Sequence, residues 1–328
     1  MTQVIDVHTH MFSREWLRLV KEFGPPQYVN ETLANGNELL FHKGAQFLNA
    51  VPAHFDYKLR LAAMDKAGVD VAVVSLTSPN CFFGDEEIGL RAARAVNDDM
   101  AQAQADHPDR IRWMLSVPWE HSVLATAEVE RAHRNGAVGA MVLANINGRH
   151  LTDPVFHSVW KALDERGLPV LVHPTVPPGA DELGIEEHNL AGSVGFMFDT
   201  TLAISRMIFD GFFDRYPNLK IIASHAGGAL PYIVGRLDRC FEMDPKRRTK
   251  ISRPPSEYLK RIYYDSVTYR QEALELCLKV GGDDNVMYGS DFPHGIGDMV
   301  GCLERVDSLS EEVGMKVRGE NAQRIFGL

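Results

Sequence analysis

The chain has 328 residues, 45% of them hydrophobic and 24% charged, a composition typical of a globular protein with a large core. Its 34 basic and 44 acidic residues give a formal net charge of −10, which argues against nucleic acid as a partner. No run approaches the roughly 20 apolar residues that span a bilayer. The start lacks a secretory signal pattern, and the four cysteines contain no CxxC pair. We therefore expect a cytoplasmic protein with reduced thiols and no membrane partner.

Short apolar segments alternate with amphipathic segments along the chain. The predicted strands are, in chain order, 4–7, 69–76, 111–117, 137–143, 169–172, 219–223, 262–264 and 286–288. Several are apolar throughout, as expected of parallel strands that are covered on both faces. The predicted helices lie between them, at 58–66, 86–106, 122–134, 155–166, 200–214, 230–241 and 271–279.

Eight strands with intervening helices predict a (β/α)8 TIM barrel. The rival is a doubly wound open sheet, which would need a glycine-rich phosphate turn after the first strand, where this chain has His8-Thr9-His10. We therefore expect one domain over residues 1–328. The connection 11–55 is too long for a simple loop, and we expect it to form a small inserted subdomain over the barrel mouth.

Five polar side chains lie at the carboxyl ends of predicted strands. His8 and His10 end the first strand, His173 the fifth, His225 the sixth and Asp291 the eighth. In a (β/α)8 barrel these positions open on one face, where catalytic groups gather. An HxH pair on a strand points both imidazoles to the same side. Three imidazoles and a carboxylate can hold one cation and leave a position for water or substrate.

Each of these residues also has an ordinary structural explanation. His173 alone would more often be a hydrogen-bonded histidine at a strand end, and Asp291 alone could cap the following helix. Together, four strand ends with ligand-type groups predict a catalytic metal site. His225 could either ligate the ion or act beside it as a general acid/base, and either His225 or Asp291 could move a proton.

The sequence resembles the amidohydrolase superfamily, in the branch of 2-amino-3-carboxymuconate 6-semialdehyde decarboxylase. The matching segments, in order, are IDVHTH, MDKAGVDVAVVS, LVHP, SHAGGALPYIVGRLDR, YYDS and YGSDFP. The resemblance implies a distorted TIM barrel with one divalent ion, most often Zn2+ with Mn2+ as the alternative. The implied ligands are His8, His10, His173 and Asp291, with His225 as the acid/base beside a metal-bound water. The fourth strand's end, VGAMVLA, has no lysine to bridge two ions, so one ion is expected.

The resemblance also implies a non-oxidative decarboxylase, a carbon–carbon lyase acting on a small unsaturated or aromatic carboxylate. It implies a homodimer in which Arg236 binds the substrate carboxylate across the subunit interface. Guanidinium suits bidentate carboxylate binding, but a surface ion pair with Asp238 is an equal alternative for Arg236. A hydrolase of esters, lactones, amides or carbon–carbon bonds would use the same ligands. A barrel that only binds a ligand is a third possibility.

One departure from the family concerns the substrate. The family has an arginine in the insertion where this chain has Leu48, so the substrate is expected to be less charged or more apolar. The basic residues nearby, His54, Lys43 and Lys58, are expected to face solvent.

Three further residues are predicted to take part in the site. We expect Phe83 and Phe292, which follow the second and eighth strands, to wall an apolar pocket, although ordinary packing is the alternative. Asp265, at the end of the seventh strand, is expected to orient a ligand histidine. His294 is expected to make a loop hydrogen bond.

Overall fold

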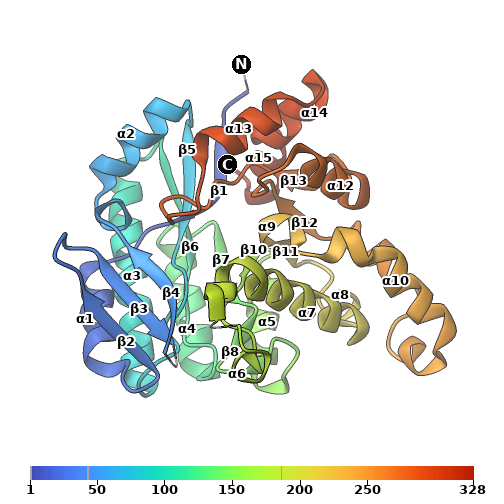
Figure 1. The fold of residues 1–328 in the computed structure, drawn as a ribbon, viewed down its shortest axis with the longest axis horizontal. Helices are drawn as coiled ribbons and strands as arrows, with labels where there is room; N and C mark the ends of the chain where they lie inside the picture. The colour runs from blue at the N-terminus through green and yellow to red at the C-terminus, as the bar shows by residue number, and fades with distance from the viewer. Residues whose placement is uncertain (1, 43, 186) are drawn as a thin grey trace.

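Eight parallel strands form the central sheet of the computed structural model, which describes residues 2–42, 44–185 and 187–328 (Figure 1). Their order in the sheet follows the chain: β1 (Ile5–His10), β5 (Val71–Ser75), β6 (Ile111–Leu115), β7 (Gly139–Leu143), β10 (Pro169–His173), β11 (Lys220–Ala223), β12 (Tyr263–Asp265) and β13 (Val286–Met287). The sheet nearly closes, because Val7 N donates to Tyr288 O at 3.0 Å and Thr9 pairs with Phe292 in a parallel bridge. The predicted (β/α)8 barrel is confirmed.

The apolar strand segments are buried on both faces. Every residue of β5, β7 and β10 is buried, which explains why these segments do not alternate between apolar and polar residues. Two strands run further than expected, β1 to His10 and β10 to His173. His10 pairs with Ser75 of β5 and His173 pairs with Leu143 of β7, so these two predicted ligands lie within the ladder, which fixes their direction.

Helices follow the strands and cover the outside of the barrel. The longer ones are α2 (Tyr57–Ala67), α3 (Glu86–Asp106), α4 (Ser122–Arg134), α5 (His157–Asp164), α7 (Phe196–Phe209), α10 (Leu230–Met243), α12 (Gln271–Gly281) and α13 (Met299–Asp307). The shorter ones are α6 (Ala180–Leu183), α8 (Phe212–Arg215), α9 (Ser224–Gly227), α11 (Pro255–Leu259), α14 (Glu311–Met315) and α15 (Asn321–Phe326). Among the described residues, no helix has the length and apolar character needed to cross a membrane.

The segment between β1 and α2 contains structure of its own. It holds α1 (Arg14–Phe23) and an antiparallel sheet of β2 (Tyr28–Thr32), β3 (Glu38–His42) and β4 (Ala45–Ala50). Trp16 of α1 donates its indole N–H to Asn80 O at 2.7 Å, which ties the segment to the loop after β5. Leu48 of β4 is buried. The assignment of 11–55 as a separate subdomain stays a prediction.

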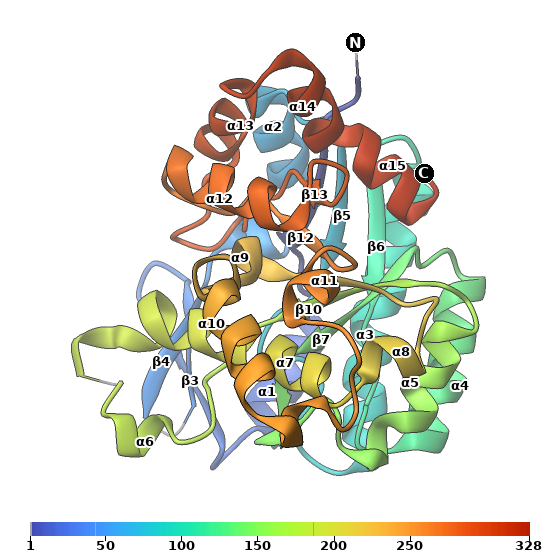
Figure 2. The ribbon, with the colours of Figure 1, turned by 90° about the vertical axis from the view of Figure 1, so that its right-hand side faces the viewer.

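Helix α10 lies at the periphery of the barrel, where it extends away from the strands (Figures 1 and 2). Its first turn packs inward through Leu230 and Pro231, which are buried. The outer face of the helix is exposed, beginning directly after Pro231 with Tyr232, which has 83% of its surface accessible. This helix carries Arg236, which is also exposed.

Candidate metal centre

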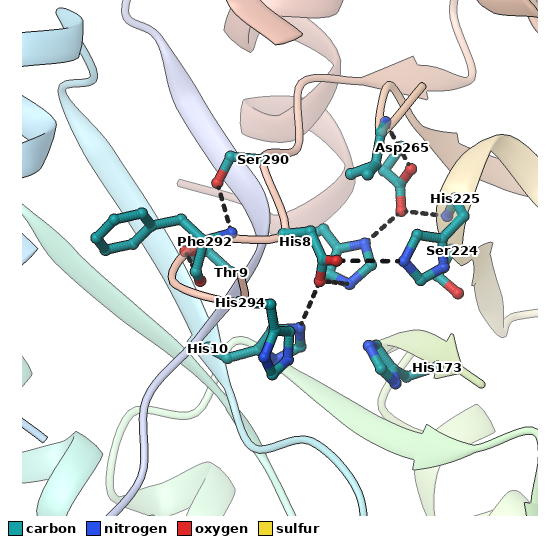
Figure 3. Close-up of polar contacts among 12 residues, drawn as sticks. His8, Thr9, His10, His173, Ser224, His225, Asp265, Ser290, Phe292 and His294 are labelled. Carbon is teal, nitrogen blue, oxygen red and sulfur yellow. Dashed lines mark hydrogen bonds and ion pairs between the residues drawn. The ribbon is translucent and has the colours of Figure 1, made fainter. Parts of the chain in front are cut away.

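Three imidazoles and one carboxylate converge at the carboxyl ends of the barrel strands. Figure 3 shows the three rings, those of His8, His10 and His173. His8 and His10 come from β1, His173 from β10 and Asp291 from the segment after β13. One ligand atom from each lies within 4.8 Å of those of the other three, and all four residues are buried. The rings of His8, His10 and His173 are edge-on to one another, with centroids 4.9–5.2 Å apart. The structure therefore brings the four predicted ligands together.

Hydrogen bonds at Nδ1 orient two of the imidazoles. His8 Nδ1 lies 2.6 Å from Asp265 Oδ2, and His173 Nδ1 lies 2.8 Å from Pro174 O. With the proton on Nδ1, each Nε2 carries a free lone pair. Both Nε2 atoms are buried and have no hydrogen-bond partner in the described part of the chain. Buried polar atoms normally have a partner, so these two lone pairs fit a cation that the cluster would hold.

The pKa shifts in the cluster favour an ionised carboxylate and, at His10 and His173, neutral imidazoles, which are the forms that bind a metal ion. Burial would raise the pKa of Asp291, but hydrogen bonds with His10 and His225 hold it well below its ordinary value. Burial lowers the pKa of His10 to about 3 and the pKa of His173 well below its usual range. Burial also acts to lower the pKa of His8, but Asp265 outweighs it and raises that pKa. A cation here would meet one carboxylate and neutral imidazoles, and would compete with a proton on His8.

Asp265 connects a ligand histidine to the turn that carries His225. Beside its contact with His8, its carboxylate accepts the backbone N–H groups of His225 at 2.9 Å, Ala226 at 3.0 Å and Val267 at 2.9 Å. His225 and Ala226 both have left-handed backbones, with φ of 55° and 52°. Such strained conformations persist where the surroundings hold them, here through the carboxylate. This geometry agrees with the orienting role expected of Asp265.

His225 lies beside the four-residue cluster and faces the cavity. Its ring centroid is 4.9 Å from that of His8 and 5.7 Å from that of His173. Its Nε2 lies 3.6 Å from Asp291 Oδ2, and about a tenth of its side chain is exposed. This position, adjacent to the ligands and open to a bound molecule, suits an acid/base.

A cavity of about 800 Å³ opens onto His173, His225 and Asp291. Much of its wall is apolar, formed by Phe47, Leu48, Phe196, Met197, Val267, Leu276 and Ile296. Of the lysines and arginines that the structure describes, Arg270 alone is among its lining residues. Arg270 was not predicted from the sequence, although its place five residues after the end of β12 was a signal for it.

Three predicted substrate contacts are not among the described residues that line this cavity. Phe83 is buried in the core, and the ring of Phe292 faces the Arg60 guanidinium at 5.1 Å. Arg236 lies on the exposed face of α10, although its neighbours Pro231 and Tyr232 reach the cavity.

Arg60 is a buried residue of the site region that sequence reasoning missed. Its guanidinium donates to Thr9 Oγ1 at 2.7 Å and to His10 O at 2.6 Å. These two hydrogen bonds hold the end of β1 in place. On the sequence it is one cation of a helix in which charged and apolar residues are mixed, with no signal that it is buried.

The basic residues of the insertion behave differently from one another. Lys58 is exposed as expected, and Lys43 lies outside the described residues. The expectation that His54 faces solvent was wrong: His54 is fully buried and its Nε2 lies 3.3 Å from His294 Nδ1. The rings of His54 and His294 both lie between the insertion and the cluster of predicted metal ligands. His54 is buried because of its position relative to β1.

Residues 5–328 match the family described as Amidohydrolase. The chain belongs to the amidohydrolase family. Its relatives include the 2-amino-3-carboxymuconate-6-semialdehyde decarboxylase of Dictyostelium discoideum, 28% identical over 99% of this chain and 91% of the relative. The gamma-resorcylate decarboxylase of Polaromonas sp. is 28% identical over 82% of this chain and 86% of the relative.

Solved structures share the barrel of this amidohydrolase. The 5-carboxyvanillate decarboxylase of Sphingomonas paucimobilis has a TM-score of 0.86 and 26% identity, with all of both chains covered. The corresponding enzyme of Novosphingobium aromaticivorans, complexed with manganese and 4-hydroxy-3-methoxy-5-nitrobenzoic acid, has a TM-score of 0.85 and 25% identity. That comparison covers 100% of this chain and 96% of the other.

The contacts of Asp265 predict a loss of metal affinity on substitution. Asp265→Asn replaces a carboxylate oxygen by an NH2 group, so two of the four N–H donors lose their acceptor. We expect the affinity for Zn2+ or Mn2+ to fall by roughly 10- to 100-fold, measured by competition with a chromogenic chelator. Asp109→Asn, at an exposed carboxylate, is the control and should leave the affinity unchanged. Equal affinity in both variants would show that Asp265 does not orient His8 for an ion.

Proposed function

We propose that this amidohydrolase is a metal-dependent, non-oxidative decarboxylase of a small aromatic or unsaturated carboxylate. The observation that carries the proposal is the buried cluster of three imidazoles and one carboxylate at the base of a largely apolar cavity. The decarboxylase names of the relatives support the reaction class. The proposed location stays cytoplasmic.

The proposed ligands are His8, His10, His173 and Asp291. Imidazole-rich sets suit Zn2+, which we propose as the ion, and the manganese-bound relative makes Mn2+ the alternative. When bound, the ion supplies Lewis-acid polarisation of substrate oxygens. Nε2 of His8 and Nε2 of His173 are buried and have no hydrogen-bond partner among the described residues. They support this ligand set independently of the relatives.

The protein side chains would bind the substrate, exclude water and deliver a proton. The apolar walls enclose the ring or diene and shield the reacting carbon. His225 gives the proton on Nε2 to the carbon that bears the carboxylate. A π pair of the ring or diene forms the new C–H bond. When the bond to the carboxylate breaks, its electrons restore that π bond, and carbon dioxide leaves. Asp291, whose Oδ2 lies 3.6 Å from His225 Nε2, orients the imidazole.

The proposed reaction predicts carbon dioxide release without hydrolysis. The metal-loaded protein, tested with 2,6-dihydroxybenzoate, 5-carboxyvanillate and related acids, should release one carbon dioxide per organic product. In H2(18)O the organic product should contain no label. His225→Asn should keep its metal and lose roughly 100-fold or more of kcat, because the proton donor is gone.

Other results would contradict this reaction. Label in the organic product would favour a hydrolase that uses the same ligands. Tight binding of acids without turnover would favour a protein that only binds its ligand. Undiminished turnover in His225→Asn would remove the acid/base role of that residue.

We propose that the protein acts as a homodimer in which Arg236 of one subunit serves the cavity of the other. Arg236 is exposed, and among the described residues it forms no ion pair with an acid; Asp238 instead accepts the N–H of Ser256 at 2.9 Å. Its helix borders the cavity through Pro231 and Tyr232. With Leu48 in place of the family's arginine, a guanidinium from a second subunit would bind the substrate carboxylate.

Mixed dimers test this arrangement. Arg236→Ala and His225→Asn homodimers should each be inactive, whereas their heterodimer has one intact site and should recover up to about half of the wild-type activity. Arg239→Ala is the matched control, because Arg239 lies on the same helix and pairs with Glu242 at 3.1 Å. Its homodimer should stay active. Verified heterodimers without recovered activity would contradict an arginine supplied in trans.

A further inference from the structure

Two histidines that the proposed chemistry does not use lie together beside the cluster. The ring of His294 packs on His10, with centroids 4.6 Å apart, and His294 lines the cavity. Behind it, His54 is fully buried and stacks on Phe12 at 4.3 Å. His54 Nε2 and His294 Nδ1 are 3.3 Å apart.

The backbone determines which nitrogen of His54 carries the proton. Val51 N–H points at His54 Nδ1 at 3.0 Å, and an N–H donor needs an unprotonated acceptor. The carbonyl of Val51 also lies 3.3 Å from Nδ1, but a proton on Nδ1 would face the Val51 N–H and leave that donor without its acceptor. His54 is therefore protonated at Nε2. Burial, together with the nearby His294 and His10, holds the pKa of His54 well below its usual range.

The tautomer of His54 determines that of His294. Nε2–H of His54 donates to His294 Nδ1, so a neutral His294 carries its proton on Nε2. Among the described residues, none forms a hydrogen bond with that Nε2. His294 therefore presents an Nε2–H donor at the edge of the cavity. The buried His54 fixes the tautomer of His294.

The ring of His294 is not needed to hold its loop. The backbone does that, since His294 N donates to Asp291 O at 3.1 Å and Gly297 N donates to His294 O at 2.8 Å. The expected loop hydrogen bond is thus made by the main chain. A fully buried imidazole at position 54 costs desolvation free energy that an apolar side chain would avoid.

We propose that His54 and His294 form a substrate-binding pair, in which His294 Nε2–H donates to an oxygen substituent next to the substrate's carboxylate. His294 lies on the His10 side of the cluster, whereas His225 lies on the side of His8 and His173. A substrate between them would meet the proton donor on one flank and the hydrogen-bond donor on the other. The inference deepens the proposed function and rests on it for the place of the carboxylate. It makes ortho-hydroxy or ortho-oxo acids the preferred class.

The tautomer is tested first, on the protein without added metal. Long-range ¹H–¹⁵N spectra of histidine-labelled protein, assigned by comparison with His294→Phe, should show His294 protonated at Nε2. In His54→Leu, which removes the donor, His294 should populate both tautomers. A wild-type His294 protonated at Nδ1 would overturn the inference.

Binding is tested by calorimetry on the metal-loaded protein, with salicylate and benzoate as probes. His294→Phe keeps an aromatic ring and removes the donor, so it should weaken salicylate binding by about 10-fold and benzoate binding by less than about 3-fold. His54→Leu should lose part of the same preference. The double variant should lose no more than His294→Phe alone, because His54 acts through His294. His133→Phe, on the distant helix α4, is the control and should change neither.

These results separate the pair from the reaction. If no acid is decarboxylated but salicylate selectivity still depends on His294, the pair stands and the proposed reaction fails. If decarboxylation is observed and His294→Phe keeps full selectivity, the pair is overturned alone. Additive losses in the double variant, or equal losses for both probes, would also overturn it.

Discussion

The contact between β1 and the chain after β13 determines where the groups of the site lie. Asp291 N donates to His8 O at 2.8 Å, and His10 N donates to Phe292 O at 2.8 Å. These bonds place the Asp291 carboxylate against two imidazoles that are more than 280 residues away in the chain. His173 then joins them because β10 ends on the same face of the barrel.

The buried carboxylates near the site carry a desolvation cost, which reduces the stability of the fold. Asp6, Asp265 and Asp291 are all buried, and burial raises the pKa of Asp6 to about 6. The Arg60 guanidinium partly compensates the charge of Asp6, and Ser290 Oγ donates to Asp6 at 2.5 Å. Unpaired buried charge destabilises a fold, so a divalent cation in the cluster would offset part of this cost and stabilise the protein.

The sequence predicted the parts of the site that depend on strand ends. Apolar strand patterns and the HxH spacing were enough to bring His8, His10, His173 and Asp291 together. His54 and Arg60 were missed because their burial depends on how the insertion and α2 pack against β1, which no local pattern encodes. Phe83 was expected at the pocket from its place after a strand, but packing draws its side chain into the core.

One measurement tests the central claim most directly: anomalous diffraction from crystals of the protein soaked in Mn2+. The account predicts one strong peak per chain, within about 2.0–2.4 Å of His8 Nε2, His10 Nε2, His173 Nε2 and an Asp291 oxygen. Crystals of His173→Ala should lose the peak or hold it weakly. Full occupancy at a different set of side chains, or no peak at this cluster, would contradict the account.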